Sequence, residues 1–257
     1  MTIPEDGLKF SYKGVTMTVP KNSTFVPYAT FFAGEYDFLN SSRKDIIIDA
    51  GANIGDYSIK ASSNANRVIA IEPFDENIRL LRDNTKTLSN IEIIESAIGK
   101  ENSNVKMSGQ GAGANINKNG AISVKVDTLD SICDELEIIP TLLKMDIEGY
   151  ECDALLGFLG HLNYVRRIVI EIHSDSNKEC CQHILSKYGF KIRFVKKSDI
   201  IKRTLKNVIT HPVSFLSYDK KNDWFATKAI FKYPITRISW IPSCGERKGM
   251  YLLEAWK

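Results

Sequence analysis

The chain has 257 residues, of which 43% are hydrophobic and 25% are charged, and its formal net charge is +3. This is an ordinary globular composition, with enough apolar residues for one sizeable core. No segment approaches the roughly 20 consecutive apolar residues of a membrane-spanning helix. The first residues lack the basic and apolar runs of a secretion signal. We therefore expect a globular protein without a membrane span.

The cysteines indicate a cellular location. There are five, an odd number, and no two form a C-x-x-C motif: Cys133, Cys152, Cys180, Cys181 and Cys244. This argues against a disulfide framework or a cysteine metal site and favours a reducing, cytoplasmic location. For the adjacent pair we expect one buried and one exposed thiol on a helix.

The first elements in chain order are a β-hairpin over residues 8–19 and an aromatic-rich cap over residues 25–40. Short apolar strands then alternate with amphipathic helices. Strands are predicted at 45–49, 67–71, 91–95, 142–146, 167–172, 190–195 and 250–256, and helices at 54–63, 75–88, 128–136, 150–160 and 177–187. This alternation predicts a doubly wound, mostly parallel α/β sheet of the Rossmann-like kind.

Two segments break this alternation. Residues 108–120 are rich in Gly and Asn and are expected to form a loop between strands near 104–107 and 122–126. Residues 196–245 are basic and aromatic. We predict an N-terminal hairpin and cap over residues 1–40 and a main domain over residues 41–257 that carries the basic, aromatic segment as an insertion.

The first predicted strand ends in Asp49-Ala-Gly-Ala-Asn-Ile-Gly55. Ligands of a doubly wound sheet bind beyond the carboxyl ends of its strands, so this turn is a candidate cofactor site. Gly51 allows a sharp turn, Gly55 allows the next helix to pack closely, and Asn53 replaces a glycine of the G-x-G-x-x-G pattern. The carboxylate of Asp49 disfavours a phosphate and favours a cationic ligand such as S-adenosylmethionine.

The next two strands end in groups that complete such a site. Glu72 can accept hydrogen bonds from ribose hydroxyls, in a site for NAD as well as for S-adenosylmethionine. Ser96 and Ala97 leave room for an adenine ring. We favour S-adenosylmethionine over NAD. The alternative is an α/β domain whose strand-end carboxylates only cap helices.

Three carboxylates lie within the sequence Lys144-Met-Asp146-Ile-Glu148-Gly-Tyr-Glu151. Glu151 enters a helix, where it can simply interact with the helix dipole. Two carboxylates over one cleft, here Asp146 and Glu148, repel each other and cost free energy unless a cationic or proton-sharing group lies there. The candidates are the sulfonium, Lys144, a divalent metal and a substrate hydroxyl, and we assign no metal ligand.

The strand at 167–172 ends in Glu171-Ile-His173. Alternation along a strand places Glu171 and His173 on one face. The near-neutral reference pKa of histidine suits a general base that removes a hydroxyl proton, so His173 is a candidate catalytic residue with Asp146 and Glu148. The alternative for His173 is a strand-end histidine bonded to the backbone.

Several segments together resemble the FkbM family of methyltransferases. They lie between residues 34 and 175 and comprise Gly34-Glu-Tyr36, Ile48-Asp-Ala-Gly-Ala-Asn-Ile-Gly55, Ile71-Glu-Pro73, Val126-Asp-Thr-Leu-Asp130, Leu143-Lys-Met-Asp-Ile-Glu-Gly-Tyr-Glu151 and Glu171-Ile-His173. The resemblance implies an S-adenosylmethionine-binding sheet with a final antiparallel strand, and methylation of oxygen on a sugar or small-molecule hydroxyl. It places Asp49, Gly51, Asn53, Gly55 and Glu72 at the cofactor and Asp146, Glu148 and His173 near the acceptor.

Two alternatives remain for the function. The basic, aromatic residues 196–245 match no part of that family. One interpretation is a surface that docks RNA or a nucleotide, and the other is a solvated basic face over a local core. The chain can also be a cofactor-binding module without catalysis.

The loop at 108–120 either closes over the acceptor or is a plain surface loop. The sequence makes no prediction of the oligomeric state.

Overall fold

The computed structural model describes residues 7–12, 14–20, 23, 25–108, 115–116, 122–210 and 249–257. Most of the predicted loop at 108–120, Cys244 and residues 211–248 of the basic segment lie outside this described part. Within it, no helix combines the length and the apolar character that a membrane crossing requires.

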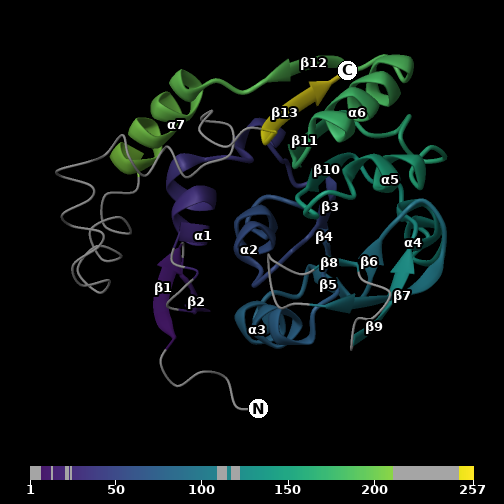
Figure 1. Ribbon diagram of the computed structural model, residues 1–257. Helices are drawn as coiled ribbons and strands as arrows, with labels where there is room; N and C mark the ends of the chain where they lie inside the picture. The colour runs from purple at the N-terminus through teal and green to yellow at the C-terminus, as the bar shows by residue number, and fades with distance from the viewer. Residues whose placement is uncertain are drawn as a thin grey trace.

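A seven-stranded sheet forms the centre of the described part (Figure 1). Its order is β12-β13-β11-β10-β3-β4-β5, and β13 runs antiparallel to both of its neighbours. The strands are β3 (Ile46–Ala50), β4 (Arg67–Ile71), β5 (Ile91–Ile94), β10 (Leu142–Met145), β11 (Arg167–Ile172), β12 (Lys191–Phe194) and β13 (Tyr251–Trp256). The doubly wound fold and the final antiparallel strand are confirmed.

Helices cover both faces of the sheet because its strands are apolar on both sides. Ile47 and Val68 pack on the face that carries α2 (Asp56–Ser62), whereas Ile48 and Ile69 pack on the opposite face. That opposite face carries α4 (Leu129–Glu135), α5 (Glu151–Leu156) and α6 (Asp175–Lys187) (Figure 1). The helix α3 (Asp75–Thr85) follows β4.

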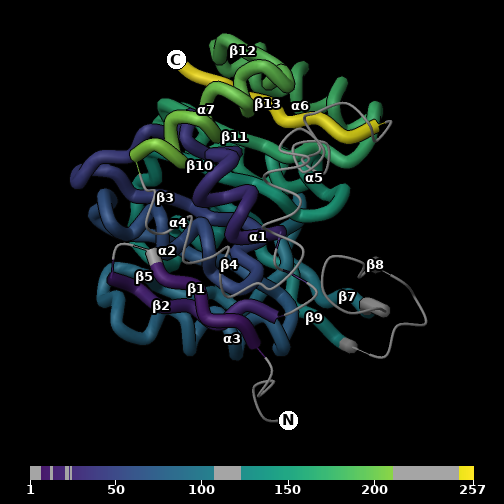
Figure 2. Tube along the Cα trace, turned by 90° about the vertical axis from the view of Figure 1, so that its left-hand side faces the viewer, coloured from purple at the N-terminus to yellow at the C-terminus, as the bar shows by residue number. Residues whose placement is uncertain are grey.

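The N-terminal segment packs into the core on the α2 face. It consists of β1 (Leu8–Tyr12), β2 (Val15–Val19), α1 (Phe25–Pro27), the π-helical turn η2 (Tyr28–Ala33) and the 3-10 turn η3 (Asp37–Leu39). Phe10, Phe31 and Phe32 are fully buried there and their rings contact one another. The predicted hairpin is confirmed and lies beside α3 (Figure 2). The basic helix α7 (Lys197–Thr210) packs on η2.

A second sheet follows β5. Its order is β6-β9-β7-β8, with β6 (Ala97–Ile98), β7 (Ser103–Ser108), β8 (Asn115–Ile116) and β9 (Ile122–Asp127). The antiparallel pairing of β7 with β9 confirms the predicted strands. The short strand β6, which pairs in parallel with β9, was not predicted, and it ties this sheet to the end of β5.

Candidate active site

A pocket lies beyond the carboxyl ends of β3, β4, β5 and β10, where the strand order of the main sheet reverses. Seven of the ten predicted site residues line it: Gly51, Asn53, Glu72, Ser96, Ala97, Asp146 and Glu148. Asp49, Gly55 and His173 are not part of its lining. The predicted cofactor and acceptor residues thus meet at one pocket, with three of them behind its wall.

The loop after β3 depends on glycine at two positions. Gly51 has a φ of +77°, and a Cβ there would lie 1.8 Å from the backbone oxygen of Asp146. Gly55 has a φ of +91°, and a Cβ there would lie 2.6 Å from Leu81 Cδ1 of α3. Both positions use the left-handed conformation that glycine adopts without a steric penalty.

Glu72 fixes the second side of the pocket. One carboxylate oxygen accepts a hydrogen bond from Asn53 N at 2.9 Å, and the other accepts from Asn77 Nδ2 at 3.0 Å and from Phe74 N at 3.2 Å. Burial raises the pKa of Glu72 above its ordinary value, and these hydrogen bonds partly offset that effect. The carboxylate has lone pairs left for a further donor.

Small residues form the wall beside β5, as predicted. Ser96 is 1% exposed, and its Oγ has no hydrogen-bond partner although it lines the pocket. Val105 and Val126 of the second sheet complete this wall. They were missed because the sequence predicted only a hairpin at that place and no sheet attached to β5.

Asp49 lies behind the pocket and not in it. It pairs in register with Lys144 of the neighbouring strand, so the two side chains share a face, and Lys144 Nζ lies 3.0 Å from Asp49 Oδ1. Ser58 donates a hydrogen bond of 2.6 Å to the other oxygen, and Lys144 donates one of 2.6 Å to Gly51 O. Burial would lower the pKa of Lys144, but Asp49 and Asp146 raise it above its ordinary value. Asp49 therefore supports the glycine loop through Lys144.

The structure gathers the acidic residues of two strand ends around His173. Met145 pairs in register with Ile170, so the following Asp146 and Glu171 stand side by side. His173 Nε2 lies 3.4 Å from Glu148, 3.6 Å from Glu171 and 3.8 Å from Asp146. The predicted shared face of Glu171 and His173 is confirmed.

Glu151 orients the ring of His173. Its carboxylate is fully buried and lies 2.7 Å from His173 Nδ1. It also accepts hydrogen bonds from Gly149 N and from Asn177 Nδ2, both at 2.7 Å. We predicted only an interaction of Glu151 with the helix dipole, and the structure adds this direct contact with the histidine.

The carboxylates change the acid–base character of His173. Burial would lower its pKa, but the hydrogen bond to Glu151 and the nearby Glu171 and Asp146 raise the pKa to about 11. This shift favours the protonated form of the ring at neutral pH. The sequence interpretation started from the near-neutral reference pKa of histidine, whereas these neighbours shift the pKa upward, and the role of His173 in turnover stays a prediction.

Two further residues of this cluster come from the Gly34-Glu-Tyr36 segment. Glu35 is 3% exposed, and burial, together with Glu171 and Asp146, raises its pKa well above the ordinary value. Tyr36 Oη lies 3.5 Å from Asp146 Oδ2, and Lys144 Nζ lies 5.3 Å from the centre of the Tyr36 ring. The family resemblance marked this segment, but nothing in the sequence pattern placed it against β10.

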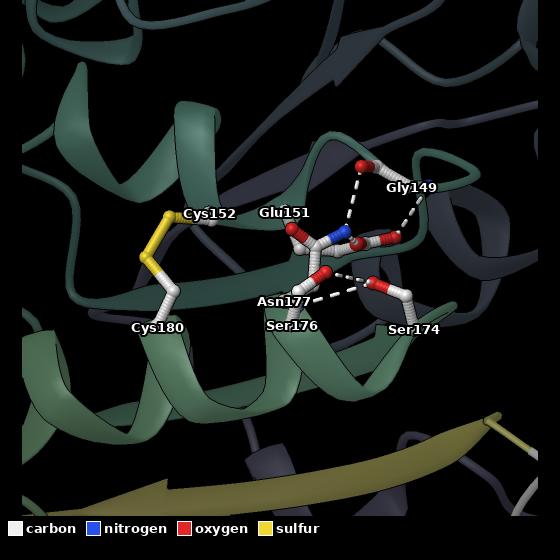
Figure 3. Close-up of a disulfide and its surroundings, with 7 residues drawn as sticks. All are labelled: Gly149, Glu151, Cys152, Ser174, Ser176, Asn177 and Cys180. Atoms are coloured by element: carbon white, nitrogen blue, oxygen red, sulfur yellow. Dashed lines mark hydrogen bonds between the residues drawn. A yellow bond between two sulfur atoms is a disulfide. The ribbon is translucent and has the colours of Figure 1, made fainter.

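A disulfide joins Cys152 of α5 to Cys180 of α6 (Figure 3). The expectation that disulfides are disfavoured is wrong for this pair, because the two cysteines, 28 residues apart, lie on helices that pack side by side. Cys181 is buried as a free thiol, while Cys180 is bonded and not an exposed thiol. The disulfide lies next to Glu151 and Asn177 (Figure 3), and Asn177 donates a hydrogen bond to Glu151, which contacts His173.

Comparison with known proteins identifies the family. The model of the methyltransferase FkbM domain matches residues 49–192, more than half of the chain. The chain belongs to the FkbM methyltransferase family. The family resemblance seen in the sequence is confirmed, and this FkbM protein is a methyltransferase with a Rossmann-like fold.

Two relatives of this FkbM protein are informative. The hexuronic acid methyltransferase AglP of Haloferax volcanii is 24% identical over 164 residues, which cover 60% of this chain and 68% of that protein. The crystal structure of methyltransferase FkbM from Methylobacillus flagellatus KT matches with a TM-score of 0.50 at 24% identity. That match covers 65% of this chain but 44% of the longer one, so the present chain spans less than half of that relative.

Proposed function

We propose that this FkbM protein transfers a methyl group from S-adenosylmethionine to a hydroxyl group of a sugar, a glycan or a related small molecule. The observation that carries the proposal is the single pocket that unites Gly51, Glu72 and Ser96 with Asp146 and Glu148. Its first three residues suit a nucleoside, and its last two suit a polyhydroxylated acceptor. A relative whose name specifies a hexuronic acid agrees with a sugar acceptor.

The residues present fit S-adenosylmethionine. Glu72 would accept hydrogen bonds from ribose hydroxyls, and the buried, unpartnered Oγ of Ser96 would meet a polar edge of adenine. When bound, the cofactor supplies a methyl group that is activated by a positively charged sulfur. The turn at Gly51 lacks the G-x-G-x-x-G pattern of pyrophosphate binding, which disfavours NAD.

The acceptor end contributes positioning. The carboxylates of Asp146 and Glu148 line the pocket and would accept hydrogen bonds from neighbouring hydroxyls of one acceptor. His173 would hold these carboxylates in place from behind the wall, since its Nε2 faces both. Transfer of an already activated methyl group gains most of its rate from such alignment of the reacting atoms.

Calorimetric titration with S-adenosylhomocysteine tests the cofactor half of the proposal. We expect binding to the wild-type chain and at least about tenfold weaker binding to Glu72→Gln, since one good hydrogen-bond partner is lost. Glu92→Gln is the matched control, because Glu92 lies on β5 and pairs with Arg67 away from the pocket. Absence of binding to the wild-type chain would contradict the proposal.

A screen of acceptors with labelled methyl donor tests the other half. Neutral sugars, uronic acids and short oligosaccharides form one set, and RNA fragments form a second. We expect label in the first set. Label in RNA alone would support the alternative of docking through residues 196–245, of which the structure describes only 196–210.

A further inference from the structure

The carboxylates and the imidazole at the acceptor end share the geometry of a cation site. One donor atom from each of Asp146, Glu171 and His173 lies within 4.8 Å of the other two. His173 Nε2 is 3.6 Å from Glu171 Oε1 and 3.8 Å from Asp146 Oδ1. Ligand atoms about 2.1 Å from one ion lie about 3.0–3.4 Å apart, so a small rotation of these side chains would bring them to ligand distance.

The donor atoms that face one another are left without hydrogen bonds. Asp146 Oδ1 and His173 Nε2 are both buried and form no hydrogen bond of good geometry with another described residue, and the His173 side chain is only 10% exposed. Glu35, which is 3% exposed, also has a buried Oε1 without a partner. Buried polar atoms are rarely left in this way, and a bound ion is one group that would satisfy them.

The second nitrogen of His173 is held as in metal-bound histidines. Nδ1 lies 2.7 Å from the fully buried Glu151, which is itself fixed by Gly149 N and Asn177 Nδ2. A ligating histidine almost always donates its other N–H to a carboxylate or a carbonyl, and this contact sets the ring orientation and the tautomer. Here it turns Nε2 toward Asp146 and Glu171.

The charge balance also favours a cation. Asp146, Glu148 and Glu171 lie within 3.8 Å of Nε2, and Glu35 lies close enough for Asp146 and Glu171 to act on it. A doubly charged ion interacts with each carboxylate about twice as strongly as a proton at the same place does. An ion at this place would therefore interact favourably with several carboxylates at once.

We propose that Asp146, Glu171 and His173 bind one divalent cation at the acceptor end of the pocket. Two carboxylates and one imidazole suit a first-row ion such as Mn²⁺, which accepts both ligand types. Because Asp146 also lines the pocket, the ion would reach acceptor hydroxyls and hold them in place. That role rests on the proposed function, whereas occupancy of the site by the ion does not.

Titration of the full chain with Mn²⁺ alone, followed by the electron paramagnetic resonance of the free ion, tests the proposal. The protein is first treated with a chelator and desalted. We expect one Mn²⁺ per chain, with and without S-adenosylhomocysteine, and at least tenfold weaker binding in Glu171→Gln and in His173→Gln. His161→Gln is the matched control, because His161 Nδ1 also lies 2.9 Å from a carboxylate, that of Asp130, and His161 is not part of the cluster.

Unchanged Mn²⁺ affinity in His161→Gln and weakened affinity in the two cluster variants would support the site. Failure of the folded wild-type chain to bind Mn²⁺, or equal binding in all variants, would overturn it and leave protonated His173 as the cation among these carboxylates. Circular dichroism verifies folding, and Asp146→Asn replaces any variant that does not fold. Calorimetry with S-adenosylhomocysteine on the same samples separates this outcome from failure of the proposed cofactor site.

Discussion

The pocket has a cofactor end around Glu72 and an acceptor end around Asp146 and His173, and the two ends satisfy their buried charges in different ways. At the cofactor end, both oxygens of Glu72 accept hydrogen bonds and Asp49 is paired with Lys144. At the acceptor end, buried atoms of Asp146 and His173 have no hydrogen-bond partner. The cofactor end is built by backbone turns next to the strands, and its two carboxylates have partners within the described part of the chain. The acceptor end is assembled from segments that are distant in the sequence. Its charges favour the binding of a further partner.

The largest expected effect comes from Gly51→Ala at the cofactor end. The new Cβ would collide with Asp146 O, and the φ of +77° would be strained. Together these costs should lower the free energy of unfolding by about 3–5 kcal/mol and abolish binding of S-adenosylhomocysteine. Urea unfolding measures the loss.

Gly189→Ala is the control for that substitution. Gly189 has a φ of +80°, but a Cβ there meets no atom within 4 Å. It should cost only the backbone strain, about 1 kcal/mol. Equal losses of unfolding free energy in both variants would show that the close approach of the loop to the end of β10 does not contribute to stability.

The disulfide behind the acceptor end should contribute the next largest effect. Cys152 and Cys180 close a loop of 28 residues, and a cross-link of that length stabilises a fold by about 3–4 kcal/mol in the chain-entropy model. Cys152→Ala should lower the free energy of unfolding by that amount, and so should reductant on the wild-type chain. If reductant leaves the wild-type unfolding curve unchanged, the disulfide does not form in solution.

A substitution at His173 separates the two ends functionally. His173→Ala should reduce turnover by about 100-fold, in the range of a lost positioning or acid–base group, on any acceptor found in the methyl-labelling screen. Affinity for S-adenosylhomocysteine should change less than twofold, since His173 does not line the pocket. Steady-state kinetics and calorimetry measure the two quantities, and equal losses in both would contradict the assignment of His173 to the acceptor end.

The smallest effect concerns Asp45, which lies at the opposite end of β3. Burial would raise its pKa, but hydrogen bonds from Arg166, Thr141 and Ser42 lower the pKa to about 2. A carboxylate with a lowered pKa stabilises the fold above the unfolded value near 4, and the contribution disappears as pH falls toward 2. Asp45→Asn should therefore cost about 1–2 kcal/mol at pH 7 and nothing near pH 2, as measured by urea unfolding at both pH values.

The framework of the main sheet could be predicted from local pattern. Apolar runs bounded by charged or turn residues predicted β4 and β11 with their observed bounds. A strand that is buried on both faces is apolar along its whole length, so its own sequence is enough to identify it. Glu72 ends one of those runs, and the structure shows it in the lining of the pocket. Ser96 and Ala97, at the end of β5, also line it.

Features that depend on contacts between distant segments could not be predicted. Asp49 was expected to face the ligand, but its register with Lys144 turns it into a buried ion pair. Glu35 joins the acceptor end only because the N-terminal segment packs against the sheet. The pairing of Cys152 with Cys180 depends likewise on how α5 lies on α6.

A crystal structure of the chain with S-adenosylhomocysteine tests the proposed cofactor site most directly. We predict the nucleoside in the pocket, with its ribose at Glu72, its adenine at Ser96 and its sulfur directed toward Asp146. Density for the ligand elsewhere, or no ligand at saturating concentration in crystals that leave the pocket accessible, would contradict the proposed function.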